Sequence, residues 1–155
     1  MYLFGKNKGY LQYVIVFFLA CASQVIVALI RGDRGFLGHD SQRYIQLANC
    51  LLDEGIGAFL QTADTPFYLL YPIFLAGIFL VFGENYLVAV VFQILFYGIT
   101  CLTIFAILQD FRDSWLINGI LTLYFALFYE VAHWNFILYS DAVALFWVAL
   151  TVYIY

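Results

Sequence analysis

Charged side chains are scarce in this 155-residue sequence, of which only 10% is Asp, Glu, Lys or Arg. The six Lys and Arg residues form no basic stripe that would neutralise nucleic-acid phosphates, so we expect no nucleic-acid partner. Apolar residues instead make up 66% of the chain, against about 45–50% in soluble domains. A soluble core of this size cannot bury so much apolar surface, and the composition therefore predicts an integral membrane protein.

Cysteine is also rare, and its three copies are scattered. Cys21 and Cys101 lie within apolar runs, and Cys50 lies in a predicted surface helix. This pattern lacks the even number of a disulfide framework and the CxxC spacing of a metal site. Glu130 and His133 have a spacing that can present two metal ligands, but a single such pair is more typical of a polar belt at a membrane interface. We therefore predict no metal site from the sequence.

Long apolar runs lie between the few charged segments and predict the membrane helices. The runs 10–30 and 86–108 are each long enough to cross a hydrocarbon core of about 30 Å as a helix. A further membrane helix is predicted over 115–134, and an incomplete one, shorter than a span, over 142–155. The predicted fold class is thus an all-α polytopic membrane protein with about four hydrophobic helices.

The orientation follows from the charges around the first apolar run. Lys6 and Lys8 precede it, which places the N-terminus in the cytoplasm by the positive-inside rule. The run is too long for a typical signal peptide and Arg31 follows it, so we interpret it as a retained anchor. These features predict a multi-pass protein of the cell membrane in which 31–65 is an external loop.

Within this external loop, residues 42–54 predict a juxtamembrane surface helix. Tyr44, Leu47 and Leu51 recur at helical spacing, polar residues occupy the other face, and Gly55 ends the pattern. An amphipathic helix of this kind lies on the membrane surface.

The segment 66–82 has two interpretations. It is close to the short limit of about 17 residues for a span, it opens with Pro66, and Pro72 interrupts it. If it spans the bilayer, Asp141 lies on the cytoplasmic side, opposite Asp40. If it is a re-entrant or juxtamembrane helix, the two acids share the external side. Hydropathy leaves both alternatives open.

The candidate site residues stand at the predicted ends of segments. Asp40 precedes the surface helix and Asp141 precedes the last apolar run, so each carboxylate is either a helix N-cap or a functional acid at the membrane surface. Asp64 is either a turn residue or a second external carboxylate. Arg43, one helical turn after Asp40, is suited to hold a phosphate through bidentate hydrogen bonds.

Three pieces of sequence occur in a distinctive order: GHDSQRY at 38–44, DTPFY at 64–68 and LYSDA at 138–142. This order resembles the N-terminal part of the polyprenyl-phosphate-sugar-dependent glycosyltransferases of the GT-C superfamily, such as protein O-mannosyltransferases and lipid A aminoarabinose transferases. Many of these relatives have a carboxylate where this chain has Ser41. They also continue through more membrane helices, so the resemblance implies a missing C-terminal half or a partner subunit.

The resemblance implies a function and a set of site residues. It implies transfer of a sugar from a polyprenyl-phosphate donor to an acceptor at the external face, with the acidic residue Asp40 as the catalytic residue. It assigns substrate binding to Arg43, Asp64 and Asp141, and it implies the re-entrant interpretation of 66–82. The lipid-linked sugar and membrane lipid are the implied partners, and a divalent metal is compatible with the chemistry. Whether 155 residues act as an enzyme alone is left open.

A competing hypothesis comes from a different class of protein. The chain would then be a non-catalytic membrane subunit, or a transporter fragment, whose carboxylates bind ions or protons. Transport requires acids that face a cavity near the bilayer midplane, whereas the acids here stand at predicted segment ends. Their placement favours the transferase hypothesis.

Overall fold

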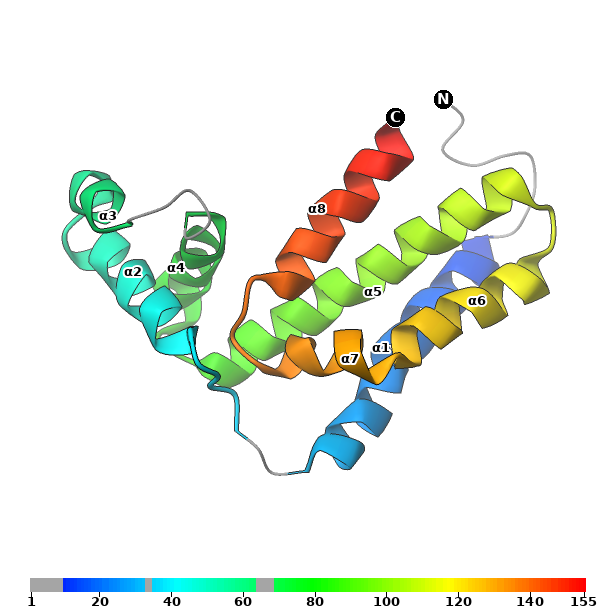
Figure 1. Cartoon of the computed structure of the whole chain (residues 1–155), viewed down its shortest axis with the longest axis horizontal. Coiled ribbons are helices and arrows are strands. Elements are labelled where there is room, and N and C mark those ends of the chain that lie inside the picture. Colours follow the sequence, from blue (N-terminus) through cyan, green and yellow to red (C-terminus); the bar gives the residue numbers. More distant parts are fainter. Residues whose placement is uncertain (1–9, 33–34, 64–68) are drawn as a thin grey trace.

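The computed structural model describes residues 10–32, 35–63 and 69–155. Every element in these ranges is helical (Figure 1). The elements in chain order are α1 (Tyr10–Arg31), α2 (Ser41–Asp53), α3 (Ile56–Thr62), α4 (Leu70–Phe82), α5 (Tyr86–Phe111), α6 (Trp115–Leu127), α7 (Tyr129–Ala132), the 3-10 helix η2 (His133–Phe136) and α8 (Asp141–Ile154).

Two helices, α1 and α5, are long and apolar enough to cross a membrane. A third span results if α6 and the segment Tyr129–Phe136 are counted together, although they are bent by 59°. The helices α4 and α8 are apolar but shorter. The all-α class and the membrane association are thus supported, whereas the number of crossings and the orientation of the N-terminus stay predictions. Lys6 and Lys8 lie outside the described residues.

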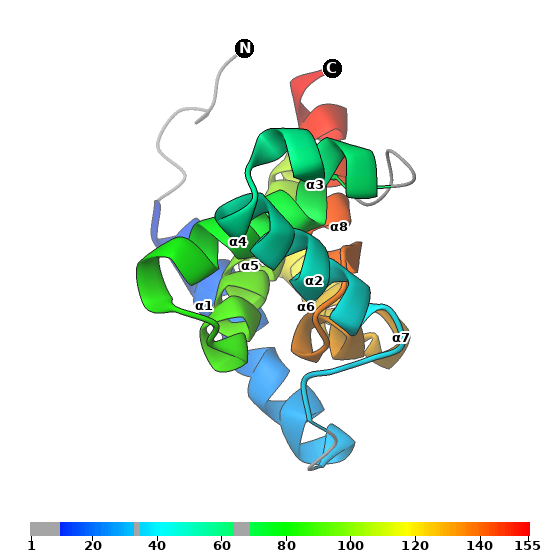
Figure 2. The same ribbon diagram turned by 90° about the vertical axis from the view of Figure 1, so that its left-hand side faces the viewer.

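The helices form a bundle and a lobe. In the bundle, α5 lies at the centre and α1, α6 and α8 pack along it (Figure 1). The lobe consists of α2, α3 and α4, and α2 packs against both of the other helices. Figure 2, turned by 90°, shows the lobe in front of the bundle. The predicted surface helix 42–54 corresponds to α2, which lies one residue earlier at each end.

Local signals explain how the chain passes from the lobe into the bundle. Gly83 has a φ of 70°, a left-handed conformation that glycine adopts without strain, and it ends α4. Asn85 then caps α5, because its side-chain oxygen accepts a hydrogen bond from the Val88 N–H at 3.3 Å. The turn between α4 and α5 is therefore encoded locally.

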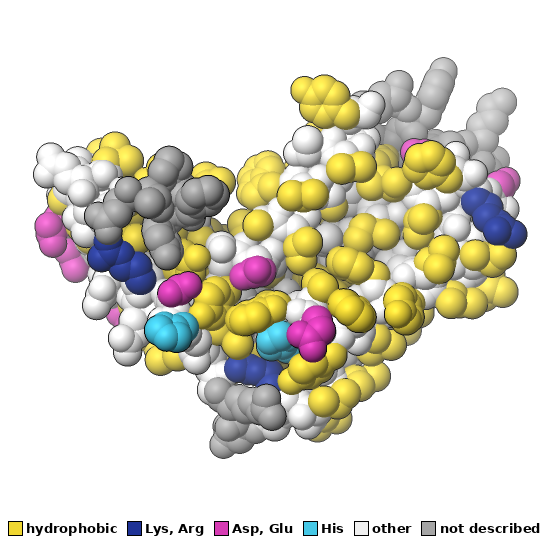
Figure 3. Space-filling model, in the orientation of Figure 1, with side chains coloured by type: hydrophobic (Ala, Val, Ile, Leu, Met, Phe, Trp, Pro, Cys, Tyr) yellow, Lys and Arg dark blue, Asp and Glu magenta, His cyan; other side chains and the backbone are white. Residues whose placement is uncertain are grey.

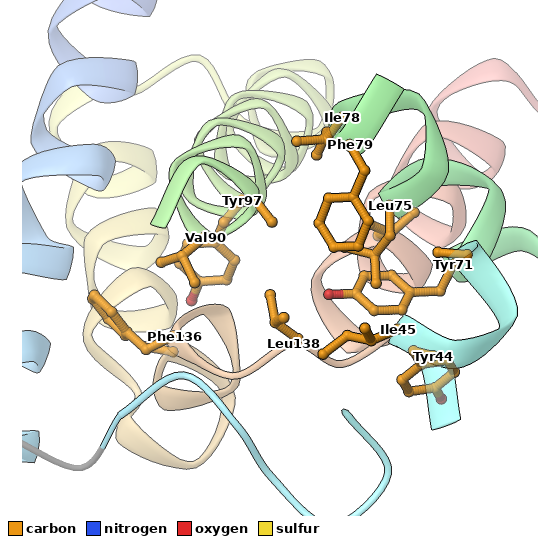
Figure 4. Packing of buried hydrophobic residues seen from close by; sticks show 14 of the residues in the cluster. Tyr44, Ile45, Tyr71, Leu75, Ile78, Phe79, Val90, Tyr97, Phe136 and Leu138 are labelled. Carbon is orange, nitrogen blue, oxygen red and sulfur yellow. The ribbon is translucent and has the colours of Figure 1, made fainter. Parts of the chain in front are cut away.

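Buried apolar side chains join the lobe to the bundle. Figure 4 shows Tyr71 and Leu75 of α4 facing side chains of α5 and of the segment after η2. The buried members of this cluster that the figure labels are Tyr44, Ile45, Tyr71, Leu75, Ile78, Phe79, Val90, Tyr97, Phe136 and Leu138. Close packing here holds the lobe against one end of the bundle.

The structure divides the predicted membrane helix over 115–134 into shorter helices. The helix α6 ends at Leu127, and Phe128 adopts an extended conformation before α7 begins. The chain then turns through η2, which brings the buried Asn135 next to α1, where its amide donates to Gln24 Oε1 at 3.0 Å. Hydropathy did not indicate a break at this position, because Leu127, Phe128 and Tyr129 are all apolar or aromatic and the first charged residue, Glu130, follows only after it.

A polar contact around Glu84 ties the lobe to the bundle. The Glu84 carboxylate accepts hydrogen bonds from the Tyr86 hydroxyl and from Asn49 Nδ2, the latter at 2.9 Å. These two hydrogen bonds stabilise the ionised form and lower the pKa of Glu84 below its usual value. The link therefore stabilises the folded protein at pH values above the unfolded-state pKa of Glu84. This stabilisation is lost as the pH falls through the lower folded-state pKa.

The Glu84 link makes stability depend on acid pH. We expect Glu84→Gln to flatten the fall in thermal stability between about pH 5 and pH 3, because this carboxylate no longer gains a proton. Thermal unfolding in detergent across this pH range measures the effect. Asp53→Asn, which removes an exposed carboxylate at the end of α2, is the control. Equal slopes in Glu84→Gln and the unaltered protein would contradict the assignment.

Close contact between α1 and α5 depends on Gly98. A Cβ atom added at this buried position would lie 2.7 Å from Cys21 Sγ and 2.8 Å from Phe17 Cε2. We expect Gly98→Val to destabilise the protein by about 1–3 kcal/mol through overpacking. Gly77→Val in α4 is the matched control, because a Cβ there meets nothing within 4 Å. Equal unfolding midpoints of the two variants in detergent would show that α1 and α5 do not pack closely here.

Candidate functional site

The segments that precede α2 and α8 meet at one end of the bundle. We call this region the loop end and define it as residues 35–41 and 137–141. Figure 3 shows acidic and histidine side chains gathered over α2, α7 and the start of α8, between hydrophobic side chains. The loop end therefore brings polar groups from distant parts of the sequence onto one face.

Hydrogen bonds hold the two segments of the loop end together. The Leu138 N–H donates to Phe36 O at 2.9 Å, and Ser41 Oγ donates to Leu138 O at 3.1 Å. The Asp40 N–H donates to the Tyr139 hydroxyl at 3.0 Å, across 99 residues of sequence. Backbone groups take part in every one of these bonds, so they fix the path of both segments rather than only their side chains.

Gly38 and Ser41 explain why the loop end closes. A Cβ at Gly38 would lie 2.3 Å from Tyr139 Cε2 and 2.7 Å from Ile137 Cγ2, so only glycine allows this approach. The Ser41 hydroxyl is fully buried and accepts from the Gly38 N–H at 2.7 Å while it donates to Leu138 O. An ionised carboxylate has no proton to donate to that carbonyl, so serine suits this position.

Asp40 occupies the N-cap position of α2, but its carboxylate makes no capping hydrogen bond. Its side chain is exposed. The capping interpretation of Asp40 therefore has no support in the geometry, and the carboxylate faces solvent without a structural task that the structure records.

Asp141 is the first residue of α8, and Ser140 holds the N-cap position without a side-chain capping bond. The Asp141 side chain is exposed. An acidic residue in the first turn is also favoured by the helix dipole. Tyr44 in α2 lies beside this segment, because its hydroxyl is 3.3 Å from Ser140 Oγ.

The other two predicted site residues are placed differently. Arg43 is half-buried, and its Nη2 donates to Thr62 O at 2.8 Å, at the last residue of α3. This bond anchors Arg43 within the lobe. Asp64 lies outside the described residues, as does the start of the 66–82 segment.

Two tyrosines have structural roles that the sequence did not indicate. Tyr139 accepts from the Asp40 N–H and packs edge-on against Trp134, with ring centroids 5.1 Å apart. Tyr44 packs against Tyr71 at 4.8 Å. The apolar periodicity of α2 indicated that Tyr44 is buried, but nothing in the sequence indicated the partner of its hydroxyl.

The Glu130 and His133 pair has an aromatic rather than a metal-binding environment. His133 Nδ1 hydrogen-bonds with Tyr129 O at 2.9 Å, and its ring stacks on Tyr129 with centroids 5.1 Å apart. Within the described ranges, no group of three or more His, Cys, Asp or Glu side chains is arranged to hold a metal ion. The geometry therefore assigns no metal centre to this part of the chain.

The shared position of the two loop-end segments predicts a labelling pattern. Single cysteines at Gln42 and Ser140, in a background without Cys21, Cys50 and Cys101, should react with a membrane-impermeant thiol reagent from the same side. Gln42 is exposed, whereas its neighbour Ser41 is too deeply buried to serve as a probe. A cysteine at the exposed Arg112, beyond the far end of α5, should react from the opposite side. Labelling of the first two positions from opposite sides would contradict the arrangement.

Comparisons with protein-family models, with curated proteins and with solved structures find no match to this chain. A functional conclusion must therefore rest on the residues of the loop end and on what their geometry can do chemically.

Proposed function

We propose that this chain forms the donor- and acceptor-binding part of a glycosyltransferase that uses a polyprenyl-phosphate sugar at the external face of the cell membrane. The proposal includes a multi-pass arrangement with the N-terminus in the cytoplasm and the loop end outside. The observation that carries it is the joining, at one end of an apolar helical bundle, of the two segments that bear the exposed side chains of Asp40 and Asp141.

The arrangement suits a substrate that has both a lipid and a polar part. The bundle exposes apolar side chains along helices long enough to contact a bilayer, and the loop end offers carboxylates, hydroxyls and aromatic rings. A polyprenyl chain would lie along the apolar surface and its sugar phosphate at the loop end. The sequence pieces at 38–44 and 138–142 that carry the resemblance are the pieces that meet there.

The proposed reaction is a displacement at the anomeric carbon. A hydroxyl or amine of the acceptor attacks this carbon, the bond to the phosphate oxygen breaks, and the electron pair leaves with polyprenyl phosphate. Asp40 takes the proton that the acceptor loses, acting as general base. Its exposed carboxylate suits this role, because no capping bond occupies it.

Arg43 is the proposed ligand for the phosphate. Negative charge grows on the leaving phosphate as the bond breaks, so a nearby guanidinium stabilises the transition state more than the ground state. The bond from Arg43 to Thr62 O holds the guanidinium in place within the lobe, which reduces the reorganisation needed for binding. Asp64 and Asp141 are proposed to bind the sugar or the acceptor.

The transport alternative has less support from the described residues. Their fully buried polar side chains are amides and hydroxyls together with Arg31, and no carboxylate is among them. An ion or proton path through the bundle requires titratable groups at depth. The alternative therefore serves as an outcome of the test below.

Removal of the proposed base tests the function. We expect Asp40→Asn to lower the rate of sugar transfer by about 100- to 10,000-fold, because no base then takes the proton from the attacking hydroxyl or amine. The full chain is reconstituted in liposomes with polyprenyl-phosphate mannose or polyprenyl-phosphate aminoarabinose, and transfer of labelled sugar to hydroxyl or amine acceptors is followed. Membrane insertion and donor capture by a photoreactive analogue should not change.

Asp53→Asn is the matched control, because it removes an equivalent exposed charge from the other end of α2. Transfer at the unaltered rate in Asp40→Asn would overturn the catalytic assignment. Failure of the unaltered chain to capture either donor, together with ion flux in the same liposomes, would favour the transport alternative.

A further inference from the structure

One amide at the junction of lobe and bundle makes three hydrogen bonds. Gln93 lies in α5 and is fully buried. Its Nε2 donates to Ile137 O at 2.8 Å and to Asn135 O at 3.1 Å, and its Oε1 accepts from the Tyr71 hydroxyl. A glutamine amide has two donor hydrogens and a carbonyl acceptor, so this single side chain links α5 to α4 and to the segment after η2.

The first link leads to the loop end along the backbone. Ile137 is followed by Leu138, which bonds to the segment before α2, and then by Tyr139, which binds the Asp40 N–H. Asp141 follows within the same short stretch, at the start of α8. The position of the Ile137 carbonyl therefore influences where the backbone places Asp40 and Asp141.

The second link reaches the same place through side chains. Tyr71 of α4 packs edge-on against Tyr44 of α2, with centroids 4.8 Å apart, and the Tyr44 hydroxyl lies 3.3 Å from Ser140 Oγ. Figure 4 shows Tyr71 extending from α4 toward Leu138, with its hydroxyl turned to the interior. The lobe and the segment before α8 are thus held in one register by the same amide.

The surroundings of Gln93 make this register costly to change. A buried donor or acceptor that loses its partner is energetically costly, because no water replaces the bond. Moving α4 or residues 135–137 alone would leave part of the Gln93 amide unsatisfied. The two parts therefore have to move together or not at all.

We propose that Gln93 is a positioning residue that sets the relative placement of Asp40 and Asp141 by holding Tyr71 and the carbonyls of residues 135 and 137 in one register. Its geometric claim stands by itself, and its effect on catalysis rests on the proposed function. Gln93 touches no reacting atom, so it acts only through the segments that it holds.

A distance measurement tests the geometric claim. Spin labels are attached at Asp40→Cys and Asp141→Cys in a cysteine-free background, and their distance distribution is measured in bilayers by double electron–electron resonance. We expect Gln93→Leu, which keeps the approximate volume but removes all three hydrogen bonds, to broaden or shift this distribution. Thr103→Val should leave it unchanged, because the hydroxyl of this buried α5 residue bonds only to Ile99 O within its own helix.

Tyr71→Phe is the milder variant and covers the case in which Gln93→Leu fails to fold. It removes one hydrogen bond but keeps the ring that packs against Tyr44. We expect a smaller broadening of the distance distribution. A distribution identical to that of the unaltered protein in every folded variant would overturn the inference.

Transfer kinetics test the catalytic consequence with Asp40 and Asp141 restored. Misplacement of a catalytic group by about 1 Å costs as much as 100-fold in rate, so Gln93→Leu should lower kcat by about 10- to 100-fold and change the KM for the donor little. Altered distances with no transfer by the unaltered protein would reject the proposed function and keep the positioning role. Normal distances and normal kcat in Gln93→Leu would reject the positioning role alone.

Discussion

The structure depends on one constraint: a polar group inside an apolar bundle must find its partner within the protein. Asn135 donates to Gln24 of α1, Gln93 of α5 donates to the Asn135 carbonyl, and Tyr71 of α4 donates to Gln93. This chain of hydrogen bonds crosses the interior from the first helix to the lobe. Apolar faces alone allow helices to slide past one another, whereas buried hydrogen bonds specify one arrangement.

The same constraint explains the break in the predicted helix over 115–134. When a helix ends inside an apolar environment, its last carbonyl groups need new partners. The Ala126 carbonyl accepts hydrogen bonds from the side chains of Ser23 and Gln24. The carbonyls of Asn135 and Ile137 accept hydrogen bonds from the Gln93 amide. The break therefore frees backbone carbonyls that accept hydrogen bonds from side chains of α1 and α5.

These hydrogen bonds also shape the loop end. Because α5 holds the backbone just before Leu138, Leu138 and Tyr139 are kept in contact with Ser41 and Gly38. Asp40 and Asp141 stay exposed on this rigid support, one on each of the joined segments. A reaction that needs two separately placed acids at an apolar surface benefits from such support, since positioned groups need little reorganisation.

Residue patterns predict the helical class, the two long apolar helices, the helix that corresponds to α2 and the candidate acids at segment ends. These follow from the periodicity and apolarity of single segments, which are local properties. The folded arrangement is needed to establish the break after Leu127, the burial of Gln24, Gln93 and Asn135, and the close approach of Gly38 to Tyr139. The physical reason is that a buried amide or a bare glycine is specified by its partner, and that partner lies on a segment remote in sequence.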